Sequence, residues 1–269
     1  MSGFADKVPL GRTGLEVSRI GVGSSYGVGS RALLAAFDAG VNYFFWGSVR
    51  TRSMAFAIRE IAARQRDDLV VVLESYTRGR HTLRWSVDRG LKALRLDCVD
   101  VLLLGWHDRL PKPALLEEAE RLREAGKFRY LAVSSHQRPL LRHFIDEDHY
   151  DIYHLRYNAA HPGAETDLFP SLPQPRPGIV SFTNTRWGTL LQQKNMPAGE
   201  TAPTAADCYR FVLTDPHVDV ASSGPKNDRE MEMATSVLSS GPMDPDELAR
   251  MRRIGRHVHG VRSIMSALT

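Results

Sequence analysis

The stretch VDVLLLGWHDRLPKPALLEEAERLREAGKFRYLAV, residues 99 to 133, contains one complete strand–helix–strand unit. Its beginning, Val99 to Leu104, is a short apolar run typical of a strand covered on both faces. From Ala114 to Ala125 the apolar residues fall three or four apart, which predicts an amphipathic helix. Gly126 then supplies a left-handed helix end, and the apolar run Phe128 to Val133 follows. The stretch therefore predicts two parallel strands joined by a covering helix.

The same pattern recurs on both sides of this unit. Further strands are expected at Ser18 to Gly23, Val41 to Phe45, Leu69 to Leu73, Ile152 to Leu155, Ile179 to Phe182 and Val218 to Ala221. Further helices are expected at Arg52 to Arg64, Thr82 to Arg95 and Pro225 to Leu238. Eight strands alternating with helices predict a (β/α)8 TIM barrel, and 269 residues suit one such domain spanning 1–269.

Two segments fall outside the eight repeats. Val8 to Val17, with a turn at Arg12-Thr13-Gly14, is expected to form an N-terminal hairpin that plugs the bottom of the barrel. Asp244 to His259 is expected to form an extra C-terminal helix. Residues 192–204 contain Pro197, Gly199 and Pro203 and are expected to form a surface loop.

Composition limits the class of protein. The net charge of +4 arises from 35 basic and 31 acidic residues that are scattered, which argues against a nucleic-acid partner. No apolar stretch approaches the length of a membrane span, so we expect a cytoplasmic protein with a small-molecule substrate. Cys98 and Cys208 are interpreted as core thiols, and the ten histidines show no spacing typical of a metal site.

In a barrel of this kind the functional site lies at the carboxyl ends of the strands. The polar residues expected there include Tyr76, His107, Asp108, His136, His154 and Arg156. His107 beside Asp108 forms a candidate acid–base pair, although adjacent loop residues more often point apart. Glu74 is a further catalytic candidate, because burial raises a carboxyl pKa; the alternative is an ion pair with Arg50 or Arg78.

The segment Ser223-Gly224-Pro225-Lys226-Asn227 lies between the last strand and a helix, with Pro225 suited to the first helical position. Such a helix start directs backbone N–H groups toward an anion, and Arg186, Lys226 and Arg229 would add positive charge. We therefore predict a phosphate site here. The alternative is an ordinary capped helix with solvated charges.

The opening, Leu10-Gly11-Arg12-Thr13-Gly14-Leu15 followed by Val17 to Gly23, resembles that of many aldo-keto reductases. The similarity continues through Ala39 to Phe44, Val99 to Leu104, Tyr157-Asn158 and Gly224-Pro225-Lys226-Asn227. The resemblance implies NADP(H) as cofactor. It implies that the nicotinamide packs on Phe182. Further cofactor contacts would come from Ser134, from Asn158 and from His154, which stands where the family often has glutamine. The phosphate contacts would come from Gly224, Lys226, Asn227 and Arg229.

The chain departs from the family at the catalytic tetrad of aspartate, tyrosine, lysine and histidine. The matching positions carry Phe45, Arg50, Glu74 or its neighbours Ser75 and Tyr76, and Gly105. Since hydride transfer to a carbonyl also requires a proton, ordinary aldehyde reduction should be slow.

Three hypotheses remain. The first is an NADP(H)-dependent oxidoreductase of small carbonyl or related substrates, with a non-standard proton donor such as Tyr76 or His107. The second is a cofactor-independent lyase or isomerase that uses Glu74, His107 or Asp108. The third is a non-catalytic barrel that binds a nucleotide or another ligand. The retained phosphate-site residues favour the first.

Overall fold

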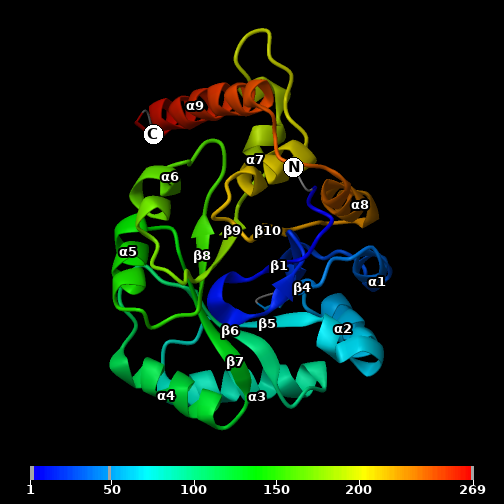
Figure 1. Cartoon of the computed structure of the whole chain (residues 1–269), viewed down its shortest axis with the longest axis vertical. Coiled ribbons are helices and arrows are strands. Elements are labelled where there is room, and N and C mark those ends of the chain that lie inside the picture. The colour runs from blue at the N-terminus through cyan, green and yellow to red at the C-terminus, as the bar shows by residue number, and fades with distance from the viewer. Residues whose placement is uncertain (1–2, 48–49, 268–269) are drawn as a thin grey trace.

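The computed structural model describes residues 3–47 and 50–267, and in them eight parallel strands close into a barrel (Figure 1). The strands follow one another around the barrel in the order β10-β3-β4-β5-β6-β7-β8-β9. Their bounds are β3 Ile20–Gly23, β4 Tyr43–Trp46, β5 Val70–Ser75, β6 Val99–Trp106, β7 Phe128–Ser135, β8 Ile152–Arg156, β9 Gly178–Phe182 and β10 Val220–Ser223. The predicted (β/α)8 TIM barrel is confirmed.

Helices surround the barrel, as the alternating pattern predicts. Their bounds are α1 Ser30–Asp38, α2 Arg52–Gln65, α3 Arg80–Leu94, α4 Pro113–Glu124, α5 Arg138–Asp146, α6 Ala164–Asp167, α7 Ala205–Thr214, α8 Asp228–Ser236 and α9 Pro245–Ala267. In α4 the stripe of Leu115, Ala119 and Leu122 is buried against the barrel. The apolar core thus has two parts, one between helices and strands and one inside the barrel.

The N-terminal hairpin closes the amino end of the barrel. Strands β1 (Val8–Pro9) and β2 (Glu16–Val17) pair in antiparallel fashion, and Gly14 turns the chain with a φ of 70° that glycine adopts readily. Leu10 and Val17 are fully buried within the apolar cluster that fills the barrel. The hydroxyl of Tyr130 donates to the carbonyl of Thr13, which ties the hairpin to β7. The predicted plug is confirmed.

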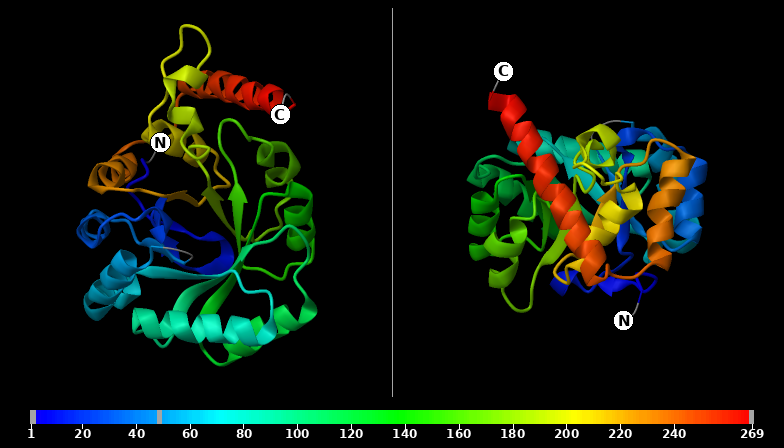
Figure 2. Two further views of the ribbon diagram at one scale, coloured as in Figure 1. Left: turned by 180° about the vertical axis from the view of Figure 1, so that it is seen from behind. Right: turned by 90° about the horizontal axis from the view of Figure 1, so that it is seen from above.

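The C-terminal helix α9 runs along the outside of the barrel (Figure 2). It is longer than the expected 244–259 segment. The Glu200 carboxylate bonds to Arg250 and Arg253 of α9, so the 192–204 loop is held against this helix. No helix in the described ranges is long and apolar enough to cross a membrane.

Two local predictions were wrong. Helix α8 begins at Asp228, with Asn227 as its cap, so Pro225 lies in the preceding loop and not at the first helical position. Asn227 takes over as the start because its side chain accepts a hydrogen bond from the Glu230 N–H. Cys208 is buried as expected, but Cys98 is only half-buried because it lies after α3 at the amino end of β6.

Candidate functional site at the barrel mouth

Side chains near the carboxyl ends of β5, β6, β7 and β9 gather several buried polar atoms that lack a partner. Among the described residues, no hydrogen bond is made by Glu74 Oε2, His107 Nε2, His136 Nδ1, Thr183 Oγ1 or Asn184 Oδ1. Buried polar atoms in folded proteins nearly always have a hydrogen-bond partner. The exceptions are often at sites where a ligand or an ordered water molecule supplies the missing partner. This end of the barrel, which we call the mouth, is therefore the candidate site.

Glu74 is carried to the mouth by β5. Val70 and Val72 belong to the cluster inside the barrel, so by the alternation of a strand Glu74 also faces inward. Glu74 is only 8% exposed. Gly47 packs against it so closely that a Cβ added to Gly47 would lie 2.4 Å from the Cβ of Glu74. Burial raises the pKa of Glu74 to about 7, opposed by a hydrogen bond from Tyr76 and the charge of Arg78. Glu74 is thus a buried carboxyl group that exchanges its proton near neutral pH.

Tyr76 lies over Gly105. The pairing of β6 with β7 shifts register between Leu104 and Trp106, so Gly105 occupies a bulge. A Cβ on Gly105 would lie 2.8 Å from Cδ1 of Tyr76. Any larger residue at position 105 would therefore displace the ring. Gly105 creates the space in which Tyr76 bonds to Glu74, while half of the tyrosine side chain stays exposed.

His107 and Asp108 do not form the acid–base pair that the sequence suggested. The Asp108 carboxylate contacts the neighbouring Arg109, with 3.3 Å between Oδ1 and Nε. His107 is 3% exposed, and burial, followed by the charge of Arg78, lowers its pKa to about 4 despite the opposing charge of Asp108. Adjacent loop residues point apart here. His107 remains at the mouth as a neutral imidazole.

The remaining tetrad positions lie at the same end of the barrel. Phe45 is the third residue of β4, and its ring centroid lies 6.1 Å from that of His154. Arg50 follows β4 with a φ of 53°, and its Nη1 donates to the Tyr26 carbonyl at 3.1 Å.

Three predicted cofactor contacts lie on β7, β8 and β9. Ser134 is buried on β7, and its carbonyl accepts from the His107 N–H at 2.9 Å. Phe182 ends β9 and is partly exposed, in edge contact with His136 at 5.0 Å between centroids. His154 lies deeper, bonded to the Tyr43 hydroxyl at 2.9 Å, and burial lowers its pKa to about 3. Phe182 is therefore accessible to a ligand, whereas His154 belongs to the barrel interior.

Asn158, a further predicted cofactor contact, is bonded to the neighbouring backbone. It is fully buried, its Nδ2 donates to the Thr183 carbonyl at 2.8 Å, and its Oδ1 accepts from the Ala160 N–H at 3.0 Å. It acts on the site by holding Thr183, whose φ is 55°. Arg186 and Trp187 also have φ values of 51°, an unfavourable region for these residue types. No pattern in the sequence predicts this strained loop.

The loop before α8 carries Gly224, Lys226, Asn227 and Arg229. Lys226, Asn227 and Arg229 are exposed, and a Cβ on Gly224 would meet the Tyr26 ring at 2.4 Å. The Glu230 carboxylate accepts the Lys226 N–H at 2.9 Å. The charged side chains are thus free to meet a phosphate, although part of the backbone at this helix start is already bonded.

Arg186 is not part of this basic surface. Its side chain is 6% exposed, and Nη1 donates to the Val258 carbonyl in α9 at 2.5 Å. The sequence placed it near the last strands of the barrel but gave no sign that α9 would bury its guanidinium. Its role is to join the strained loop to the C-terminal helix.

An aromatic wall forms one side of the mouth. The His136 ring lies 6.0 Å from Trp106, 5.0 Å from Phe182 and 6.1 Å from Trp187, measured between centroids. Trp106 and Trp187 are both exposed. We call these four residues the aromatic wall. Aromatic side chains of this kind are suited to contact a flat or apolar ligand.

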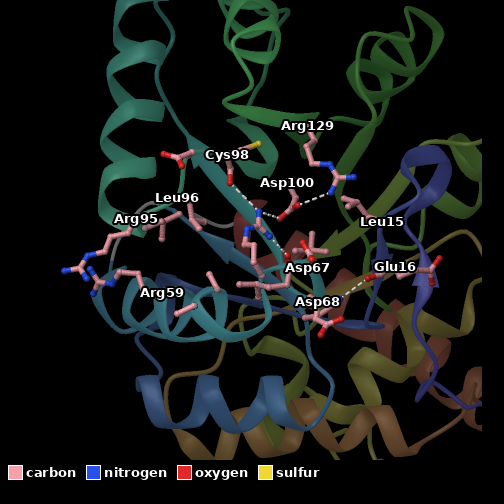
Figure 3. Close-up of a pocket in the computed structure, with 18 of the residues that line it drawn as sticks. Leu15, Glu16, Arg59, Asp67, Asp68, Arg95, Leu96, Cys98, Asp100 and Arg129 are labelled. Carbon is pink, nitrogen blue, oxygen red and sulfur yellow. Dashed lines mark hydrogen bonds and ion pairs between the residues drawn. The ribbon is translucent and has the colours of Figure 1, made fainter.

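A hollow of about 930 Å³ lies at the opposite end of the barrel (Figure 3). Its charged groups largely satisfy one another, since Arg66 bonds to Asp100 at 2.9 Å and Arg129 reaches the same carboxylate at 3.4 Å. It lies at the amino ends of the strands, where conserved stability contacts and not catalytic groups are usual in this fold. The mouth is thus the better candidate despite the volume of the hollow at the amino end. No group of three histidine, cysteine or carboxylate residues in the described chain could hold a metal.

Solved structures of aldo-keto reductases superimpose on this chain. One from Bacillus halodurans, in its holo form, superimposes with a TM-score of 0.77 at 16% identity, over 93% of this chain and 96% of the other. One from Klebsiella pneumoniae in complex with NADPH gives 0.75 at 20% identity, over 95% and 96%. The chain therefore has the aldo-keto reductase fold that its sequence implied.

Similarity in sequence points the same way. The L-galactose dehydrogenase of Arabidopsis thaliana is 24% identical over 217 residues, which make up 68% of this chain. The match spans 66% of that relative, just under two thirds of its length. No protein-family model matches the chain.

Proposed function

We propose that this chain, which has the fold of the aldo-keto reductases, is an NADP(H)-dependent oxidoreductase with a non-standard proton donor. The observation that carries the proposal is the Glu74 carboxyl, buried at the mouth with Oε2 unpartnered and a pKa raised to about 7. A carboxyl with this pKa is suited to general acid catalysis near neutral pH. The NADPH complex of the Klebsiella pneumoniae protein supports the choice of cofactor.

The residues at the mouth fit such a cofactor in part. Phe182 presents an accessible ring at the end of β9, and Ser134 lies at the same end of the barrel on β7, with β8 between them. Lys226 and Arg229 expose positive charge before and in α8. Lys226, Asn227 and Arg229 would meet the phosphates, while Gly224 keeps the backbone close to Tyr26. When bound, the nicotinamide supplies a hydride.

The protein then has to supply a proton to the carbonyl oxygen. Glu74 holds this proton at its carboxyl group below pH 7, and Tyr76 orients the carboxyl through their hydrogen bond. Gly105 leaves the space in which the tyrosine ring lies. The aromatic wall excludes water from one side of the substrate, which strengthens polar interactions at the mouth. Asp108 contributes no proton transfer in this scheme, because it faces Arg109.

The proposed enzyme acts on a small molecule in the cytoplasm. Cys98 and Cys208 are both free thiols, which agrees with a reducing compartment. The even mixture of 35 basic and 31 acidic residues supports a small substrate over a nucleic acid.

A second candidate function is a cofactor-independent lyase or isomerase. It is favoured by the opposite pKa shifts of Glu74, raised to about 7, and His107, lowered to about 4. Between about pH 4 and pH 7, a protonated Glu74 and a neutral His107 are both present at the mouth, the first able to donate a proton and the second able to accept one. This reading needs no nucleotide, so cofactor binding separates the two candidates.

The test is titration of the protein with NADPH and NADH, followed by quenching of tryptophan fluorescence from Trp106 and Trp187. We expect NADPH to bind more tightly than NADH, and Lys226→Ala to weaken NADPH binding about tenfold through loss of a charge-assisted contact. Lys112→Ala, at the start of α4, is the matched control and should bind normally. Absence of binding at millimolar cofactor overturns the proposal and leaves the second candidate.

A further inference from the structure

Arg156 is the last residue of β8 and faces the mouth. Ile152 lies in the cluster inside the barrel, and His154 contacts Tyr43 and Phe45 there, so Arg156 continues the same inward face. It pairs in register with Phe182 of the aromatic wall. Its charge lowers the pKa of His136, second to the effect of burial. Arg156 therefore lies beside the aromatic wall.

The charge of Arg156 has no anionic partner in the described part of the chain. Within residues 3–47 and 50–267, no hydrogen bond or ion pair involves its guanidinium, although the residue is half-buried. Burial lowers its pKa, followed by repulsion from Arg138, and no carboxylate opposes the shift. Partly buried arginines normally have a partner, because desolvating an unpaired charge is costly.

The neighbouring arginines differ from Arg156 in this respect. Arg138 bonds to Asp167 at 2.5 Å, and Arg186 bonds to the Val258 carbonyl. The pKa of His161 is lowered to about 3, first by burial and then by the nearby positive charges of Arg156, Arg186 and Arg138. The region is thus positive on balance, with one guanidinium available to an anion. An arginine fork matches a carboxylate in geometry as well as in charge.

We propose that Arg156 is a specificity-determining residue that binds a carboxylate of the substrate, so that the enzyme acts on carbonyl compounds that also carry an acid group. The inference rests on the proposed function, in that it takes the mouth as the substrate site. Glu74 on β5 and Arg156 on β8 are separated by β6 and β7 in the barrel. The substrate would therefore lie across the mouth, with its reacting carbonyl near Glu74 and its acid group near Arg156.

The first experiment measures binding without cofactor, by quenching of tryptophan fluorescence. The probes are benzoate and benzamide, which have similar shapes and differ in charge, together with succinate and citrate. We expect benzoate to bind at least tenfold more tightly than benzamide, and Arg156→Gln to abolish this preference. Arg156→Lys should retain part of it. Arg129→Gln removes the same charge at the opposite end of the barrel and should leave binding unchanged.

Several results would overturn the proposal: equal binding of benzoate and benzamide, a preference that survives in Arg156→Gln, or no binding of any carboxylate probe. Unchanged circular dichroism and thermal midpoint in Arg156→Gln confirm that the variant folds. If Arg156→Gln loses NADPH binding while inorganic phosphate displaces benzoate, the residue holds a cofactor phosphate and the substrate assignment is wrong.

A second measurement separates this inference from the proposed function. With NADPH, 4-carboxybenzaldehyde should be reduced with a KM at least tenfold below that of benzaldehyde, and only in protein that retains Arg156. If NADPH does not bind but the charge-dependent preference for benzoate persists, the oxidoreductase is wrong and the carboxylate site stands. If NADPH binds and the two aldehydes are reduced with the same KM, the oxidoreductase stands and the carboxylate site is wrong.

Discussion

Glu74 links the protonation of one side chain to the stability of the fold. Its folded pKa of about 7 lies above the ordinary value of 4.5, so the folded form keeps a proton that the unfolded chain has lost. The protonated Glu74 carboxyl group therefore contributes to the free energy of unfolding. This contribution is fully present below pH 4.5 and is lost as the pH rises toward 7. The difference corresponds to roughly 3 kcal/mol.

Glu74→Gln tests this linkage. We expect the variant and the parent protein to be similarly stable at pH 4.5, and the variant to be more stable by about 3 kcal/mol at pH 8. Urea unfolding at a series of pH values gives both free energies. His107 and His154 titrate in the opposite sense but are present in both proteins, so their effect cancels. A pH-independent difference would show that Glu74 is ionised in the fold.

Gly105 and Tyr76 provide a second prediction about Glu74. In Gly105→Ala the new methyl group should displace the Tyr76 ring, and loss of its hydrogen bond should raise the pKa of Glu74 further. The pH at which the reduction rate falls should therefore be higher in Gly105→Ala than in the parent protein. Tyr76→Phe should shift this pH in the same direction. Gly241→Ala is the control, because no atom lies within 4 Å of its added Cβ. A shift to lower pH in either variant would contradict the assignment.

Position along the chain was enough to place Glu74 and Tyr76 at the mouth, because residues at or just after the end of a barrel strand lie there. It was not enough to find their relation to Gly105, which depends on a bulge in β6 that no sequence period records. Asn158 shows the converse. Its residue type and position suggested a ligand contact, but did not reveal its hydrogen bonds to the Thr183 carbonyl and the Ala160 N–H.

At the scale of elements, the loop after β9 is held in strained backbone by its neighbours. Thr183, Arg186 and Trp187 all have φ values near 50°, each costing of order 1 kcal/mol or more. The Asn158 amide and the contact of Arg186 with α9 offset this cost. The loop can therefore keep a shape that presents Trp187 to the mouth.

Asn158→Ala should release this loop. We expect unfolding stability to fall by about 2 kcal/mol, because the Thr183 carbonyl and Ala160 N–H lose their bonds. Adding Thr183→Gly, which removes the cost of the positive φ, should recover part of the loss. Urea unfolding of the single and double variants measures both effects. Equal stabilities of parent and Asn158→Ala would show that the amide does not hold the loop.

The elements themselves were predictable to different degrees. The strands and α2, α3 and α4 followed from apolar periodicity, because burial against the barrel requires it. The start of α8 was misplaced by three residues, since Pro225 and Asn227 are both acceptable near a helix start and only the hydrogen bond to Glu230 decides between them.

For the whole molecule, the attachment of α9 is the feature most open to test. Gly255 lies against the loop after β8, and a Cβ there would approach the Ala159 carbonyl oxygen to 1.9 Å. Gly255→Ala should therefore destabilise the protein by about 1–3 kcal/mol. Gly260→Ala in the same helix has no atom within 4 Å and should be neutral or slightly stabilising. Urea unfolding compares the two, and equal effects would contradict close packing at Gly255.

The hairpin at the amino end has a consequence for the order of events in turnover. Because Leu10 and Val17 fill that end in the described part of the chain, a cofactor and a substrate bound as proposed would both enter through the mouth. Two ligands that share one entrance cannot exchange independently. Whichever lies deeper must arrive first and leave last, so the kinetics should be sequential and ordered, with one product competing directly against the first ligand to bind.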